Sequence, residues 1–125
     1  MSPEGHFEAY ELFGDSGLHR WRLESDGQTV AVSRLAFSGP IEAWGAAARF
    51  VTLSRELDYV VFEGGGRWYW SAQTAHGERL AFAGVEFWTR ELAQSAGDRV
   101  RRIAAEIDAS NDRSGLPGPP QTIGR

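Results

Sequence analysis

The stretch RWRLESDGQTVAVS, residues 20–33, decides the fold of this chain. Side chains over residues 19–25 alternate between polar and apolar, with Trp21 on the apolar side. Alternation with a period of two is typical of a half-buried strand. Asp26-Gly27 favours a type I′ turn, because both central residues of that turn need a positive φ. Residues 28–34 then run back, so the stretch predicts a β-hairpin.

Other elements are predicted on both sides of this hairpin. Strands are expected over residues 8–13 and 57–63. A helix is expected up to about Arg55, with Ser38 as its N-cap and Pro40 in its first turn, where a missing N–H costs nothing. The apolar side chains that helical spacing places on its buried stripe are Ile41, Trp44, Ala48 and Val51, and Leu53 stays open as a fifth.

The same pattern returns about fifty residues later, in RWYWSAQTAHGERLAFA, residues 67–83. Trp70 lies 49 residues after Trp21. Further matches at a spacing of 49 or 50 are Tyr10 with Tyr59, Phe13 with Phe62, Gly27 with Gly77, Ala31 with Ala81 and Phe37 with Phe87. A second helix is expected from the N-cap Thr89 to Ile107. So many matches in one register predict a tandem repeat of a β-β-β-α unit.

The predicted domain is a single one, made by both repeats together. The chain has 125 residues, and a half of about 50 residues buries too little apolar surface to be stable alone. The first repeat is expected over 7–57 and the second over 58–107, with flexible tails at 1–6 and 108–125. The second tail is rich in Pro and Gly, and a short added strand over 121–123 stays open.

Composition restricts the function classes. The net charge is −4, and a mildly acidic protein is poorly suited to follow a phosphate backbone. Cysteine is absent, which excludes disulfides and thiolate chemistry. No apolar run approaches the ~20 residues that cross a bilayer, and the first six residues lack signal-peptide features. We therefore expect a cytoplasmic protein without membrane contact.

A distinctive set of residues in the first copy resembles a known family. The set is Tyr10-Glu11-Leu12-Phe13, Asp15, Gly17, Arg20-Trp21-Arg22-Leu23, Gly27 and Ala31-Val32-Ser33. It is similar to the YegP-like family, a small domain of unknown function. The second copy keeps the aromatic and glycine positions but has Ser71-Ala72 for Arg-Leu and Ala83 for the serine.

The resemblance spans roughly residues 7–107 and implies an α+β fold. Two tandem β-β-β-α units would form one continuous antiparallel sheet with two helices packed on one face. No catalytic residues are established for the family, so the resemblance assigns none to this chain.

Motifs for catalysis or metal binding are not evident in the sequence. Gly64-Gly65-Gly66 precedes a predicted strand, whereas a phosphate loop precedes a helix, so a hairpin turn is favoured. The three histidines, His6, His19 and His76, lack the spacing of a metal pair. No G-x-S-x-G motif is present. We expect no enzyme activity, no catalytic residue, no cofactor and no metal.

The candidate interaction surface is the sheet face opposite Trp21 and Trp70. The residues expected on it are Arg20, Arg22, Phe62, Arg67 and Tyr69. Aromatic side chains with arginine around them on an open sheet are typical of an association surface. The equal alternative is that a swapped strand, a loop or the tail covers this face.

Three functions follow from these patterns. The first is a non-enzymatic interaction module that binds a protein partner or itself through the open sheet face. The second is single-stranded nucleic-acid binding through arginine and aromatic side chains on the sheet, which the acidic charge makes unlikely. The third is a small-ligand or enzymatic pocket between the two repeats.

Overall fold

The computed structural model describes residues 5–12 and 17–110 and shows an α+β protein. Three strands, a helix, three strands and a second helix follow one another along the described chain. The strands are β1 (Gly5–Glu11), β2 (His19–Ser25), β3 (Gln28–Ser33), β4 (Asp58–Gly64), β5 (Arg67–Gln73) and β6 (Arg79–Ala83). The helices are α1 (Pro40–Leu53) and α2 (Arg90–Ser110).

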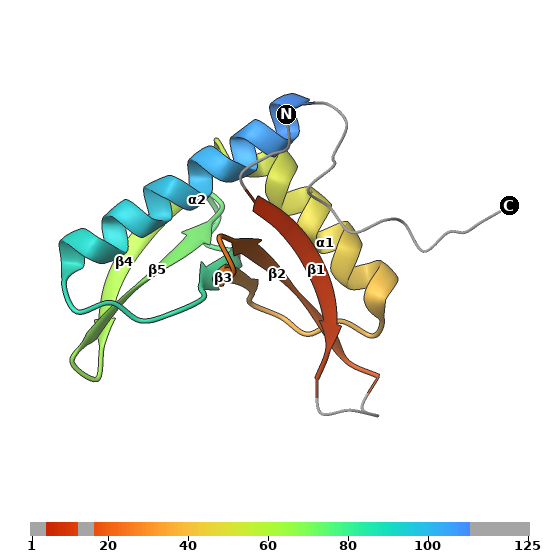
Figure 1. Ribbon diagram of the computed structural model, residues 1–125, viewed down its shortest axis with the longest axis horizontal. Coiled ribbons are helices and arrows are strands. Elements are labelled where there is room, and N and C mark those ends of the chain that lie inside the picture. The colour runs from red at the N-terminus through yellow and green to blue at the C-terminus, as the bar shows by residue number, and fades with distance from the viewer. Residues whose placement is uncertain (1–4, 13–16, 111–125) are drawn as a thin grey trace, which may run out of the picture.

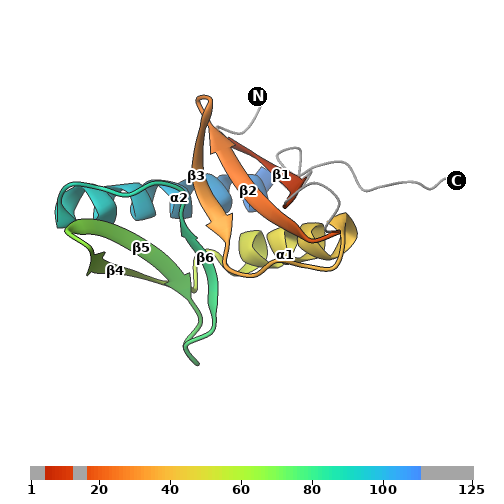
Figure 2. The ribbon, with the colours of Figure 1, turned by 90° about the horizontal axis from the view of Figure 1, so that it is seen from below.

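All six strands form one antiparallel sheet in the order β1-β2-β3-β6-β5-β4. Strands β1 and β4 are therefore the two edges, at the right and left of Figure 1. Both helices lie on one side of the sheet, and the other side faces the viewer in Figure 2. The predicted fold class, with one antiparallel sheet and two helices on one face, is confirmed.

The centre of the sheet is the junction of β3 with β6. Val32 pairs with Phe82, which lies 50 residues later in the chain. On either side of this pair, Ala31 pairs with Ala83 and Ser33 pairs with Ala81. Ala83 lies 50 residues after Ser33 and Ala81 lies 50 residues after Ala31, so each of the two residues pairs with the counterpart of the other. The two halves thus meet through matching positions. That they arose by duplication of one unit stays a prediction.

One core lies between the sheet and the helices, and both halves contribute to it. In the first half, the Trp21 ring stacks on Phe50 at 5.2 Å and meets the edge of Phe7 at 5.3 Å, between centroids. In the second half, Trp70 lies 5.7 Å from Tyr59. Trp21 and Trp70 are fully buried, as predicted.

The predicted match of Tyr10 with Tyr59 is wrong. Phe7 pairs with Leu23 and Tyr59 pairs with Ala72, so Tyr59 corresponds to Phe7. Sixteen residues separate Phe7 from Leu23 but only thirteen separate Tyr59 from Ala72. A shift by an odd number of residues turns a side chain to the other face. Tyr10, which pairs with Arg20, accordingly lies on the face away from the helices.

The buried stripe of α1 also differs from the predicted one. Ile41 is 63% exposed and Trp44 is half-buried. The buried residues of this helix are Ala43, Ala47, Phe50 and Val51. Stacking of Phe50 on Trp21 fixes the rotation of the helix, and small alanine side chains let it lie close to the sheet.

Several predicted boundaries move by a few residues. Strand β1 begins at Gly5, two residues before the predicted start of the first repeat, and α2 continues past Ile107 to Ser110. Phe13 and the remainder of the predicted tail, 111–125, lie outside the described residues. Neither helix in the described ranges combines the length and apolar character needed to cross a membrane.

Candidate functional site

Strand pairing places one residue from each strand in a row across the sheet face away from the helices, here called the open face. The row contains Glu8, Arg22, Val32, Phe82, Ser71 and Val60. It is charged at the β1 end and apolar at the β4 end. The open face therefore has a polar half on β1–β3 and an apolar half on β4–β6.

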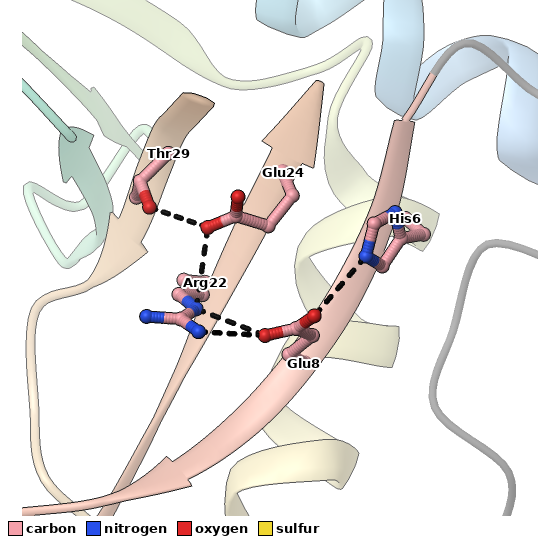
Figure 3. A network of polar contacts seen from close by, with 5 residues as sticks. All are labelled: His6, Glu8, Arg22, Glu24 and Thr29. Carbon is pink, nitrogen blue, oxygen red and sulfur yellow. Dashed lines mark hydrogen bonds and ion pairs between the residues drawn. The ribbon is translucent and has the colours of Figure 1, made fainter. Parts of the chain in front are cut away.

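The polar half carries a network of hydrogen bonds and ion pairs (Figure 3). Arg22 donates to Glu8 from Nη2 at 2.8 Å and from Nε at 3.1 Å. The same Nε lies 3.2 Å from Glu24, which also accepts a hydrogen bond from the Thr29 hydroxyl. His6 contacts Glu8 at 3.2 Å. The single Arg22 guanidinium in this network is thus shared between the carboxylates of Glu8 and Glu24.

Proton affinities in this network follow from its contacts. The hydrogen bond from Arg22 lowers the pKa of Glu8, and the contact with His6 lowers it further. The hydrogen bond to Glu8 raises the pKa of Arg22. Both side chains are more than a third exposed, so solvent screening limits the pair to well under ~1 kcal/mol of stability.

The apolar half carries an aromatic cluster, defined by Val60, Phe62, Tyr69 and Phe82. The Phe62 ring stacks on Tyr69 at 5.5 Å and meets Phe82 at 6.4 Å, edge to face. Val60 is 40% exposed and Phe62 is 36% exposed, although both lie in a regular strand. Since β4 is an edge strand, the cluster extends to the margin of the sheet.

The predicted surface residues separate into two groups. Phe62 and Tyr69 lie together in the aromatic cluster, as expected. Two of the three arginines, Arg20 and Arg22, lie on β2, away from the cluster. Arg22 lies in the polar network, Arg20 donates to the Arg34 carbonyl at 3.3 Å, and Arg67 bonds elsewhere.

Arg67 points towards the segment before α2 rather than across the sheet. Its Nε lies 3.1 Å from Glu86, and its guanidinium lies 3.7 Å from the centroid of the Trp88 ring. The cation–π contact accounts for the position of Trp88. The prediction of arginines around the aromatic cluster is therefore wrong for Arg20 and Arg22, which lie on β2, whereas Arg67 lies two residues before Tyr69 on β5.

Phe82 is the member of the cluster that sequence reasoning missed. The signal was present, because Phe82 lies 50 residues after Val32, within the second predicted hairpin. Following the alternation through residues 79–83 would have placed Phe82 on the open face.

The residues considered for catalysis or metal binding lie apart. Gly65 and Gly66 have φ of 61° and 82° and form the turn between β4 and β5, which confirms the predicted hairpin. His19 contacts the Gly17 carbonyl at 3.2 Å, and His76 is exposed in the β5–β6 connection. Over residues 5–12 and 17–110, no three histidine or acidic side chains gather as metal ligands would.

Comparison with known proteins supports the fold. No protein-family model matches the sequence, and no curated protein matches it. The solution NMR structure of YegP from E. coli, a protein of unknown function, is similar to this chain with a TM-score of 0.64. The match covers 84% of this chain and 90% of YegP at 14% sequence identity. This structural similarity shows that the chain, with its six-stranded sheet and both helices on one side, has a YegP-like fold.

Proposed function

We propose that this protein is a non-enzymatic interaction module that binds a short apolar segment of a partner protein on the aromatic cluster. The observation that carries the proposal is the exposure of Val60 and Phe62 beside Tyr69 on an open, helix-free sheet face. Aromatic side chains favour such contacts because they bury a large area at little entropic cost.

The size of the aromatic cluster argues for a short partner segment. A stable interface between two globular proteins uses about 20–30 residues on each side, and the cluster has four. An extended peptide needs fewer side chains when it adds a strand to a sheet edge, because backbone hydrogen bonds supply affinity. Strand β4 is such an edge, and its alternate residues Val60 and Phe62 give contacts for side chains of the peptide.

The other edge suits this role less well. On β1 the open-face residues are His6, Glu8 and Tyr10, and two of them belong to the polar network. The Arg22 guanidinium lies 4.9 Å from the Tyr10 ring centroid. An arriving strand would have to desolvate these charged groups, which opposes binding.

The same contacts count against the nucleic-acid alternative. A phosphate-binding face needs cations that can exchange counterions for phosphates. Arg22 and Arg67 are instead paired with the carboxylates of Glu8 and Glu86.

The test is a selection of displayed random peptides on the immobilised full-length protein. We expect enrichment of extended peptides with aromatic or aliphatic residues at alternate positions. Binding should be lost in the Phe62→Lys variant, since a charge in the cluster cannot be buried without large cost. Amide chemical-shift changes on titration should concentrate on β4 and β5.

Ile41→Lys is the matched control, because Ile41 is an exposed aliphatic side chain on the helix-bearing side of the molecule. This variant should bind the selected peptides as the wild type does. Equal binding by Phe62→Lys, or failure to enrich any peptide, would contradict the proposal. A concentration-dependent dimer that is lost in the Phe62→Lys variant would show that the partner on the aromatic cluster is a second copy of this chain and not a peptide.

A further inference from the structure

An open cleft of about 490 Å³ lies at the end of the sheet where β3 stops and β6 begins. It shares no lining residue with the aromatic cluster. Its lining consists of Arg34, Gln73, Gly77, Glu78 and Arg79. Arg34 directly follows β3, whereas the other four residues lie between the end of β5 and the start of β6. The fold thus brings one arginine from each half of the chain to the same cleft.

The two guanidinium groups of this cleft are not used inside the molecule. Arg22 and Arg67 pair with carboxylates elsewhere on the surface. Arg34 and Arg79, by contrast, form no side-chain hydrogen bond, ion pair or ring contact with any residue of the described ranges, 5–12 and 17–110. A cleft with two uncompensated cations is unexpected in a chain whose net charge is −4. Such a cleft attracts anions, because low-dielectric walls focus the field of its charges.

The carboxylate in the lining belongs to a different arginine. Glu78 accepts two hydrogen bonds from the Arg49 guanidinium of α1, at 2.9 and 3.0 Å. The hydrogen bond lowers the pKa of Glu78, so its negative charge is committed to Arg49. Asp58 lies beyond Gln73 in the same row of paired residues, so two strand spacings of about 4.8 Å each separate it from Arg79.

The corresponding position in the first half has a carboxylate where this cleft has an amide. Gln73 pairs with Arg79 just after a register shift between β5 and β6, and Glu24 pairs with Thr29 just after the equivalent shift between β2 and β3. Glu24 binds both the Thr29 hydroxyl and Arg22. In the second half, an arginine replaces the hydroxyl and an amide replaces the carboxylate. Arg79 therefore lies beside a neutral side chain where the other half supplies an anion.

We propose that this cleft binds a phosphate ester of a small hydroxylated molecule. A guanidinium matches a phosphate with two parallel hydrogen bonds. The two guanidiniums of Arg34 and Arg79 suit the charge of about −1.5 to −2 that a phosphomonoester carries at neutral pH. The Gln73 amide adds neutral donors. A monocarboxylate would compensate only one of the two cations.

The remaining lining sets the class of the esterified molecule. Among the described residues, no aromatic or aliphatic side chain lines the cleft, so a nucleobase or an acyl chain would gain no stacking or apolar contact. Glu78 can accept hydrogen bonds from hydroxyl groups, because a carboxylate offers about four acceptor sites and Arg49 uses two. Its charge would repel a second phosphate group. A volume of about 490 Å³ leaves room for a body the size of a sugar, since ligand pockets span about 300–1,000 Å³.

The test is an NMR titration of the full-length protein with glucose 6-phosphate, and with glucose and inorganic phosphate as its two parts. We expect the ester to shift the amide resonances of Arg34, Gln73 and Arg79, with a Kd of about 1 mM or tighter. Glucose and inorganic phosphate should each bind at least ~10-fold more weakly, because hydrogen bonds to charged groups carry that difference.

Three outcomes would overturn the proposal. Absence of binding by the ester, or shifts confined to other residues, would remove the site. Equal binding of glucose would exclude recognition of the phosphate. Equal binding of inorganic phosphate would exclude recognition of the hydroxylated body.

Three variants test the assignment of the site. Arg34→Gln and Arg79→Gln should each weaken glucose 6-phosphate at least ~10-fold, and both positions are exposed, so the fold should be retained. Gln73→Glu should do the same with both arginines present, since it places a carboxylate beside Arg79. Wild-type affinity in Gln73→Glu or in either arginine variant would contradict the assignment.

Arg55→Gln is the matched control. Arg55 is an exposed arginine whose side chain also has no partner among the described residues, but it does not line the cleft. Loss of its charge should leave the Kd unchanged within about twofold at physiological ionic strength, because salt screens exposed charges that do not touch the ligand. An equal loss of affinity in this variant would show that net charge, and not the cleft, determines binding.

Discussion

At the residue scale, the register of β4 on β5 places the Tyr59 hydroxyl in a buried position. Tyr59 occupies the position that Phe7 has in the first half, against the second core tryptophan. Its hydroxyl is buried and has no hydrogen-bond partner among the described residues. Burial raises the pKa of this phenol, while the Arg101 guanidinium 5.1 Å from the ring opposes the shift weakly.

Tyr59→Phe is expected to increase the free energy of unfolding by about 1 kcal/mol, because a buried polar group without a partner is destabilising. The aromatic contact with Trp70 would be kept, as Phe7 keeps it with Trp21. Chemical denaturation at neutral pH measures the difference. Tyr69→Phe on the open face serves as control and should change stability by less than ~0.5 kcal/mol. A clear loss of stability in Tyr59→Phe would show that the hydroxyl is satisfied.

At the scale of elements, the two helices begin at equivalent positions with different chemistry. The Ala43 and Ala93 amides donate to the Gly39 and Thr89 carbonyls at 3.2 Å, 50 residues apart. Thr89 also accepts the Leu92 amide on its hydroxyl at 3.1 Å, which confirms the predicted N-cap. The N-cap of α1 is Gly39 without a side-chain bond, so the predicted cap at Ser38 is wrong.

Thr89→Ala should therefore reduce stability by about 1 kcal/mol, the usual cost of losing a side-chain N-cap. Ser38→Ala is the matched control, since Ser38 precedes the N-cap of α1, and its effect should be within ~0.5 kcal/mol. Thermal and chemical unfolding of both variants provide the measurement. Equal losses would mean that Ser38 contributes to capping in solution.

Local signals predicted the elements well, and long-range geometry explains the misses. Asp26 and Gly27 have φ of 54° and 76°, so the first hairpin turn follows directly from the two residue types. The face of β1 was not predictable, because it depends on the length of the β1–β2 connection rather than on the strand itself. Rotation of α1 likewise depends on Phe50 meeting Trp21, a contact between distant residues.

At the scale of the whole molecule, the sequence predicted the place of the open face but only part of its chemistry. Phe62 and Tyr69 follow from alternation along two strands. The ion pairs and hydrogen bonds of Arg20, Arg22 and Arg67 do not follow from alternation, because they depend on which acceptors the fold brings within reach of these long side chains.

The junction between the halves offers a test of their interdependence. Gly84 follows β6, and a Cβ added there would lie 2.4 Å from the Thr29 carbonyl oxygen in the first half. The two nearest atoms both belong to the Thr29 backbone, so the backbone of β3 or β6 would have to move. Because both halves line one core, strain at this point should be felt throughout the molecule.

Gly84→Ala is accordingly expected to reduce stability by about 2 kcal/mol, as overpacking does. Native-state hydrogen exchange should show equal losses of protection at Phe50 in α1 and Ile103 in α2, since the slowest amides exchange by global unfolding. Gly45→Ala is the control, with open space at its Cβ, and should stabilise α1 by about 0.5–1 kcal/mol. Loss of protection in α2 alone would show that the second half unfolds separately, and the shared core would then not make the halves one cooperative unit.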